Sequence, residues 1–379
     1  MRIRFRTVGT LLAVALAAAA CGGDDDDGTG DDGTGDDSAG DDSSTDDGGG
    51  AVDQQVLVDF ADQVVIPTYQ LLADRAIALD DAAAALDDER SDESLDAARQ
   101  AWADTRVPWE ESEAFLFGPV SAQGWDPAMD SWPLNKDDLD AVLASGDELT
   151  QDFIRNLPET QKGFHTIEYL LWGDDSQKTA ADFDDREIEY LLALTEELTL
   201  ITTDLATSWT DGVGGQAAYR DVFTTAGDSG NTAYGSIDSA VQEMLGGMAG
   251  ICDEVANGKI AEPFGARDPN LVESQYSFNS LLDFQDNMRS VLNAYTGDFP
   301  AGETEGSGLD DFVAEVDPDL DARFKGELDD AISALGEIPS PFPAAIQDPG
   351  NDAAIEAAQA AIATVQSTIE GDLTAVLLQ

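Results

Sequence analysis

The chain has 379 residues with 78 acidic and 18 basic side chains, so its formal net charge at pH 7 is −60. That charge argues against nucleic acid as a partner, because phosphate binding needs clustered lysine and arginine side chains. Two cysteines exclude a disulfide scaffold, and a single histidine, His165, excludes any metal site built from several histidines of one chain.

The first residues are predicted to direct export. Three arginines among the first six residues precede a short apolar run over 8–20, which is typical of a secretory signal peptide over 1–20 and too short for a spanning helix. The run ends in alanines before Cys21 and resembles a bacterial lipobox in which Ala18 replaces the usual leucine. We therefore predict acylation of Cys21 and a lipid-anchored protein of the bacterial envelope, in the periplasm or at the outer membrane. An ordinary signal peptide with an incidental cysteine is the alternative.

The next segment is predicted to be a disordered acidic tether over 21–50. Residues 22–50 hold only Gly, Asp, Ser, Thr and one Ala, and twelve of them are Asp. No apolar surface is present to offset the entropy of ordering such a chain. The recurring Asp-Gly-Thr-Gly-Asp could bind calcium loosely, although it lacks the full EF-hand pattern.

The remaining sequence has the pattern of a helical protein. Apolar residues recur at spacings of three and four over 186–209, 230–256 and 352–378, which indicates long amphipathic helices of bundle type. Further helices are expected over 52–80 (interrupted by Pro67), 92–117 (kinked at Pro108), 136–155, 159–172, 273–296 and 318–336. We predict an all-α fold of two helical-bundle-like halves packed together, with the glycine-rich break over 210–218 dividing 51–211 from 212–379.

The only histidine lies in the segment 163–173, which reads Gly-Phe-His-Thr-Ile-Glu-Tyr-Leu-Leu-Trp-Gly. His165 and Glu168 are i,i+3 neighbours away from the apolar stripe, so an imidazole and a carboxylate can converge on one ion or proton. A hydrogen-bonded histidine–glutamate pair is the structural alternative. Gly163 is expected within the helix, where its cost suggests close approach by another element.

Two other segments carry polar residues at the spacing of packed helices. Arg106 and Glu113 lie seven residues apart, on one side of a predicted helix. Asn279, Asp283 and Asp286 recur at spacings of four and three, so they face either solvent or a polar site between helices. The side chains expected to line such a site are Arg106, Trp132, Asn279, Ser280, Asp286 and Arg289.

Taken together, these segments resemble the imelysin-like family, which is also classified as a peptidase family. The resemblance lies in Gly-x-His-x-x-Glu continued as Tyr-Leu-Leu-Trp-Gly, in Trp-x3-Arg-x-Pro-Trp, in Ser-Trp-Pro-Leu and in Phe-x-Asn-Ser-Leu-x-Asp-Phe-x-Asp-Asn, and it spans about 52–378. It implies a two-domain all-α fold and an exported bacterial protein associated with iron regulation or uptake. It also implies a functional role for His165 and Glu168.

The chemistry stays open between three classes. A hydrolytic zinc site needs three protein ligands, a water and a general base, and the sequence identifies no base. An oxygen-rich site with one imidazole suits iron or manganese at least as well as zinc. We therefore expect a metal site of His165, Glu168, Glu113 and Asp283 that binds a divalent or ferric ion, iron being favoured and zinc the alternative. The protein would serve iron uptake with iron-uptake components as partners; a metal-dependent peptidase and a metal-free protein-docking module are the alternatives.

Overall fold

The computed structural model describes residues 52–300 and 306–378, and their regular structure consists of helices without strands. The all-α prediction is therefore confirmed. The predicted signal peptide, Cys21 and the tether over 21–50 lie outside the described residues.

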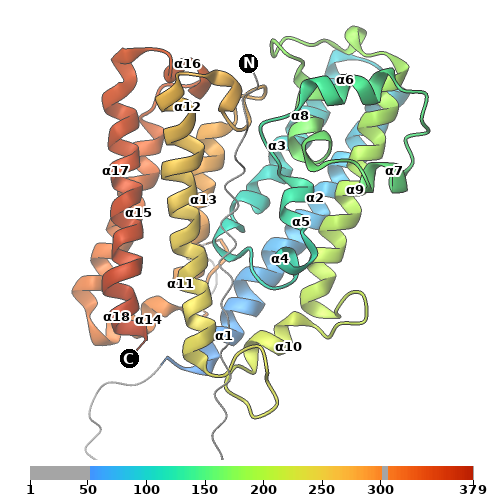
Figure 1. The fold of residues 1–379 in the computed structure, drawn as a ribbon. Helices are drawn as coiled ribbons and strands as arrows, with labels where there is room; N and C mark the ends of the chain where they lie inside the picture. The colour runs from blue at the N-terminus through green and yellow to red at the C-terminus, as the bar shows by residue number, and fades with distance from the viewer. Residues whose placement is uncertain (1–51, 301–305, 379) are drawn as a thin grey trace, which may run out of the picture. The chain divides into compact units, whose positions relative to one another are not determined.

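A first group of long helices lies on the right of Figure 1 and consists of α2 (Ile66–Asp88), α3 (Asp92–Glu110) and α9 (Asp185–Thr210). Helix α2 packs against both α3 and α9. The starts of α3 and α9 are fixed by Ser91 and Asp184, whose side chains accept hydrogen bonds from backbone N–H groups of the first turn. Buried leucines of α2 seven residues apart, such as Leu72, Leu79 and Leu86, face this packing.

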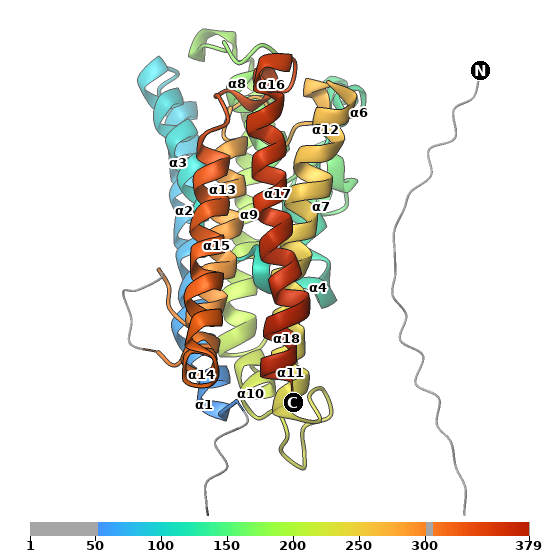
Figure 2. The same cartoon turned by 90° about the vertical axis from the view of Figure 1, so that its left-hand side faces the viewer.

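A second group of helices lies to the left of the first in Figure 1 and faces the viewer in Figure 2; it consists of α11 (Ile237–Asp253), α13 (Ser280–Thr296), α15 (Pro318–Gly336) and α17 (Asp352–Thr368). Helix α15 packs against α17 and α13, while α11 packs against α17 and α13. The predicted stripe of α11 is buried, including Val241, Met244 and Met248.

Shorter helices connect the long ones. The α-helices among them are α1 (Gln54–Asp59), α4 (Pro119–Gln123), α5 (Trp125–Met129), α6 (Lys136–Ala144), α7 (Gln151–Arg155), α8 (Phe164–Trp172), α10 (Tyr219–Thr224), α12 (Ala261–Ala266), α14 (Leu309–Val316), α16 (Phe342–Ala345) and α18 (Thr374–Leu377). The π-helical segments are η1 (Phe60–Val65), η5 (Glu254–Ile260) and η8 (Ile369–Leu373). The 3₁₀ turns are η2 (Glu113–Phe115), η3 (Glu159–Gln161), η4 (Ala180–Asp182), η6 (Pro269–Leu271) and η7 (Pro349–Asn351).

The two groups of helices share one hydrophobic core. Helix α13 packs against α3, and both α11 and α13 pack against η2. The predicted boundary between residues 211 and 212 falls in the loop that joins α9 to α10, and it stays a prediction. None of the helices in the described ranges combines the length and the apolar character that crossing a bilayer requires.

Several predicted helix limits were wrong. Pro67 does not interrupt its helix, because the chain stays helical from Gln54 to Asp88 and passes through the wider π turn of η1 just before the proline. The helix expected over 136–155 is two helices, α6 and α7. Helix α3 ends two residues after Pro108, and α13 begins only at Ser280.

Gly163 precedes α8 instead of lying within it. Its φ of 76° and ψ of −163° belong to a region that is open almost only to glycine. A Cβ atom at this position would lie 2.1 Å from the carbonyl oxygen of Met129. The expected close approach is thus present, and it brings the start of α8 against the residue before Asp130.

We predict that Gly163→Ala lowers the free energy of unfolding by about 3 kcal/mol or more, because backbone strain and a backbone clash add together. Gly124→Ala is the matched control, since Gly124 also has a positive φ, of 65°, but nothing lies within 4 Å of its would-be Cβ. The control should lose only about 1–2 kcal/mol. Urea denaturation measures both losses, and equal losses would contradict the role assigned to the contact with Met129.

Candidate functional site

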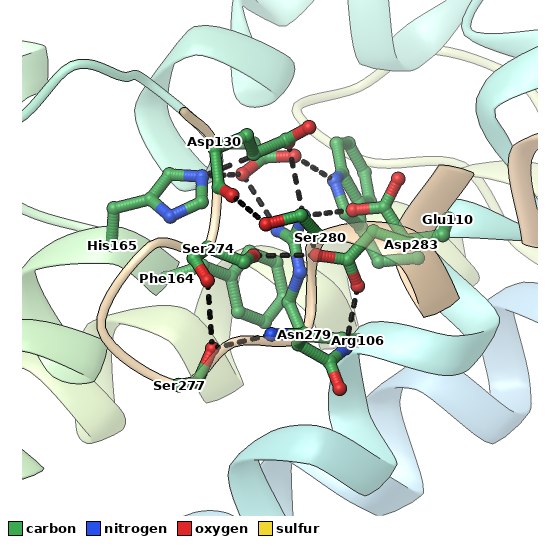
Figure 3. A network of polar contacts seen from close by, with 12 residues as sticks. Arg106, Glu110, Asp130, Phe164, His165, Ser274, Ser277, Asn279, Ser280 and Asp283 are labelled. Atoms are coloured by element: carbon green, nitrogen blue, oxygen red, sulfur yellow. Dashed lines mark hydrogen bonds and ion pairs between the residues drawn. The ribbon is translucent and has the colours of Figure 1, made fainter. Parts of the chain in front are cut away.

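A guanidinium buried between the two groups of helices forms the centre of a polar network. Arg106 of α3 has no exposed surface. It contacts Asp130 at 2.6 Å, Glu273 at 3.1 Å, Asp283 at 3.6 Å and also Glu110, one turn further along α3. The four carboxylates come from α3, the residue after α5, the turn before α13, and α13 itself, so one side chain joins segments that are distant in sequence (Figure 3).

His165 lies at one edge of this network and faces Asp130 (Figure 3). Its Nε2 atom is 2.9 Å from Oδ1 of Asp130 and 3.8 Å from Oε1 of Glu273. Despite these contacts, Nε2 is buried and makes no hydrogen bond of acceptable geometry. Its other ring nitrogen, Nδ1, lies 3.2 Å from Oε2 of Glu168. A proton on Nδ1 would leave the lone pair of Nε2 directed at the carboxylates.

Glu168 fixes a turn as well as the imidazole. Its Oε1 atom accepts hydrogen bonds from the backbone N–H of Tyr276 at 2.9 Å, the backbone N–H of Ser277 at 2.7 Å and the Ser277 hydroxyl at 2.7 Å. One carboxylate therefore orients His165 and fastens the turn that carries Glu273. With both oxygens engaged, the geometry makes Glu168 a support for a ligand more readily than a ligand.

A buried lysine adds a second positive charge. Lys259 of η5 is 1% exposed, and its Nζ atom lies 3.1 Å from Oε2 of Glu273 and 3.6 Å from Oε2 of Glu110. Oε2 of Glu273 is buried and makes this ion pair but no hydrogen bond of acceptable geometry. The lysine thus neutralises part of the negative charge without satisfying every oxygen.

The structure places the residues predicted from the sequence at different distances from His165. Asp283 lies on the far side of Arg106 and accepts hydrogen bonds from Ser274 and Asn279. Glu113 is near Asp130 but not among the contacts of His165. The hydroxyl of Ser280 donates to the carbonyl of Glu273 at 2.6 Å.

Three further predicted residues lie around this centre. The ring centroids of Trp132 and His165 are 6.3 Å apart. Asp286 pairs with Arg289, whose side chain is 38% exposed, so this pair lies at the edge of the network.

Sequence reasoning missed three close partners of His165 and Arg106, which are Asp130, Glu273 and Glu110, and also Lys259, which pairs with Glu110 and Glu273. The spacing of residues in the sequence could have indicated two of them. Glu110 follows Arg106 by one helical turn, and Lys259 follows Val255 of the apolar stripe by four residues. Asp130 and Glu273 lie outside helices, where nothing marks two carboxylates among 78 acidic residues.

The electrostatics of the centre follow from burial and pairing. Burial alone would lower the pKa of His165, but the carboxylates of Asp130, Glu168 and Glu273 raise that pKa well above its ordinary value. Burial would raise the pKa of Asp130, yet Arg106 and His165 hold it well below its usual range. Without another cation, the imidazole therefore carries a proton and the carboxylate is ionised.

Two sets of three side chains have ligand atoms that all lie within 4.8 Å of one another in the described ranges. One set is Asp130, His165 and Glu273, and the other is Glu110, Glu113 and Asp130. The first combines an imidazole nitrogen with carboxylate oxygens, and Nε2 of His165 lies 2.9 Å from Oδ1 of Asp130 and 3.8 Å from Oε1 of Glu273. This donor set fits a divalent or ferric metal ion.

Comparison with known proteins identifies the family. The family model described as imelysin, Peptidase M75, matches residues 65–369. The chain belongs to the imelysin family. This confirms the resemblance inferred from the sequence motifs.

Several members of the imelysin family are similar to this chain over most of their length. The chain is 34% identical over 319 residues to "Iron-regulated protein A" of Synechococcus elongatus. The alignment covers 84% of this chain and 85% of the relative. A crystal structure of an iron-regulated protein A precursor from Parabacteroides distasonis superposes with a TM-score of 0.79 at 30% identity, covering 87% of this chain and 97% of the other. An imelysin-like protein from Psychrobacter arcticum, with a TM-score of 0.65 at 17% identity and coverage of 86% and 98%, shares the fold.

A pair of acidic groups at the edge of the network should make stability depend on pH. Burial and the neighbouring Asp286 raise the pKa of Glu111 to about 7, and burial raises the pKa of Asp286 to about 6. The folded state then binds more protons than the unfolded state. The free energy of unfolding is therefore higher in acid, and this contribution is lost as the pH rises through 7.

We predict that Glu111→Gln is more stable than the wild type at pH 8 by roughly 1–2 kcal/mol, after allowing for solvent screening. The difference should shrink toward zero at pH 5, where the folded wild type holds the proton. Urea denaturation from pH 5 to 8 measures it. Glu196→Gln, at an exposed position of α9, is the control and should follow the wild type. An unchanged pH profile in Glu111→Gln would show that Glu111 is ionised in the folded protein throughout.

Proposed function

We propose that this imelysin-family protein binds a metal ion, iron being favoured, at His165, Asp130 and Glu273, and that it serves iron uptake from a lipid-anchored position in the bacterial envelope. The observation that carries the proposal is the buried set of Asp130, His165 and Glu273, whose ligand atoms all lie within 4.8 Å of one another and include Nε2 of His165 at 2.9 Å from Asp130. A metal ion would replace the proton that pairs the imidazole with these carboxylates, and its positive charge would stabilise their ionised form.

Iron is favoured for two reasons. One imidazole with carboxylate oxygens is a donor set that iron accepts readily, whereas structural zinc sites favour more nitrogen and sulfur ligands. In addition, the relatives from Synechococcus elongatus and Parabacteroides distasonis carry the name iron-regulated protein A, which supports an iron-related role here.

The surrounding residues have separate tasks in this proposal. His165, Asp130 and Glu273 would hold the ion, whose positive charge would balance the negative charge of the carboxylates. Arg106 and Lys259 keep Asp130 and Glu273 in place by ion pairs. Glu168 holds the imidazole by Nδ1, as carboxylates commonly do for histidine ligands.

A metal-dependent peptidase is the alternative that the family name suggests, but the space beside His165 does not favour it. The cavity between Trp132, His165, Glu168 and Tyr276 has a volume of about 10 Å³, which is room for roughly one water molecule. A peptide would need this region to open. A docking surface for another protein is also disfavoured, because His165 is only 3% exposed.

We predict that the protein binds Fe²⁺ or Co²⁺ and that His165→Ala, Asp130→Asn and Glu273→Gln each lower the affinity by more than about 100-fold. Glu168→Gln should lower it by about 10–100-fold, the usual effect of losing a supporting hydrogen bond. Affinity should also fall as the pH falls, because the ion must displace the proton from His165. Titration calorimetry on protein purified without a histidine tag measures these values.

Asp286→Asn is the control for this titration, since Asp286 pairs with Arg289 at the edge of the network, and its affinity should match the wild type. Circular dichroism verifies folding of each variant. If His165→Ala binds as tightly as the wild type, the metal site is elsewhere. Peptide cleavage that is abolished by a chelator would favour the peptidase alternative.

The lipid anchor is proposed from the sequence alone. Cys21 follows an arginine-containing start and a short apolar run, and a segment of Gly, Asp, Ser, Thr and a single Ala follows it. We predict that Cys21→Ala moves the protein from the membrane fraction to the soluble fraction of the expressing bacterium, measured by immunoblotting after fractionation. A variant that stays in the membrane fraction would remove the anchor from the proposal.

A further inference from the structure

An acidic pocket of about 400 Å³ lies next to the His165 centre. Carboxylates from four elements line it, namely Glu113 of η2, Asp126 of α5, Glu243 of α11 and Glu254 of η5. Phe117 and Ile251 contribute apolar walls, and no basic side chain is among the lining residues. Such a cluster of carboxyl groups supplies oxygen ligands for a cation, and the cation in turn stabilises their ionised form.

Glu113 shows that the pocket is more than an acidic patch. The residue is only 8% exposed, and its carboxylate makes no hydrogen bond and no ion pair within the described parts of the chain. Burial, together with the carboxylates of Glu254 and Glu110 and against the influence of Lys259, raises the pKa of Glu113. Burial and Asp130 likewise raise the pKa of Asp126 to about 7. A bound cation would relieve both the burial cost and the repulsion.

The pocket is continuous with the buried centre through its carboxylates. Ligand atoms of Glu113, Glu110 and Asp130 lie within 4.8 Å of one another, and Asp130 contacts His165. Asp126 precedes Asp130 by one helical turn. Beside His165 itself, Trp132 and Tyr276 leave a cavity of only about 10 Å³. The acidic pocket is therefore the roomier approach to the centre.

We propose that this pocket is an outer binding site for a hydrated divalent metal cation, which it captures from solvent and passes by way of Glu113 to the His165 centre. The all-oxygen lining suits a hard cation that keeps several of its waters. Of the pocket carboxylates, only Glu113 belongs to a set of three close ligand atoms, so the others would reach the ion through water. The transfer step rests on the proposed function, whereas binding in the pocket does not.

Co²⁺ alone is the probe, and Asp126→Asn and Glu254→Gln, singly and together, are the variants. Equilibrium dialysis should show that the wild type binds one equivalent of Co²⁺ tightly and a second equivalent more weakly. The double variant should bind only the tight equivalent. Stopped-flow quenching of tryptophan fluorescence follows loading, since Trp132 lies near His165 and Trp109 donates to Asp130. At low ionic strength, Co²⁺ should load the tight site of the double variant about tenfold more slowly, or slower still, than that of the wild type. The tight affinity should not change, because a change in the route alters association and dissociation equally.

Controls separate this proposal from the proposed function. Asp330→Asn, at an exposed position of α15, should load at the wild-type rate. His165→Ala should keep the weaker equivalent and lose the tight one. The pocket variants should fold at least as stably as the wild type, because each removes a carboxylate from a repelling cluster, and thermal melts verify this.

Two results would overturn the outer site. One is a double variant that keeps both Co²⁺ equivalents, and the other is a double variant that loads at the wild-type rate over a range of salt concentrations. By contrast, a His165→Ala protein that keeps the tight equivalent would contradict the proposed function and leave the weaker equivalent in the pocket standing.

Discussion

The buried guanidinium of Arg106 is the interaction on which the rest of the centre depends. A planar group with several N–H donors can contact four carboxylates at once, which a lysine ammonium on a flexible stem does less well. These contacts reach from α3 to the residue after α5, to the turn before α13, and to α13 itself. Because breaking a buried ion pair typically costs about 3–5 kcal/mol, Arg106 holds the two groups of helices together and also positions the donors around His165.

The charges at this centre do not balance among the side chains themselves. Arg106 and Lys259 supply two positive charges against the carboxyl groups of Glu110, Asp130, Glu273 and Asp283, and burial raises the pKa of Glu110 and of Asp283, so the centre takes up protons in part to reduce the excess negative charge. A protonated His165 makes up part of the deficit, and a metal ion would do so more completely. The basic residues are few in this chain, 18 against 78 acidic, yet two of them are wholly buried here. These two cations therefore pair with the buried carboxylates of the centre and not with those of the acidic surface.

The sequence supported the helices and the central histidine but not the complete site. Heptad-like spacing located the long helices, because burial of one face is a local property of the sequence. The same reasoning found Arg106, His165, Glu168 and Asp283, whose positions follow from helical periodicity. Asp130 and Glu273 could not be found this way, since each is brought to His165 by a non-helical turn and by contacts distant in sequence. The exact start of α13 was missed for the same reason, as the turn before it is set by Glu168.

The Gly-x-His-x-x-Glu motif acquires a physical reading from these contacts. Gly163 allows α8 to begin against the backbone of Met129, and this places His165 opposite the next residue, Asp130. One turn later, Glu168 holds Nδ1 of His165 with one oxygen and the backbone of residues 276–277 with the other. That turn in turn carries Glu273 toward Arg106 and Lys259. Each fixed residue of the motif thus positions a different wall of one centre. A side chain at 163 would move the helix away from Asp130, and loss of the carboxylate at 168 would release both the imidazole and the turn.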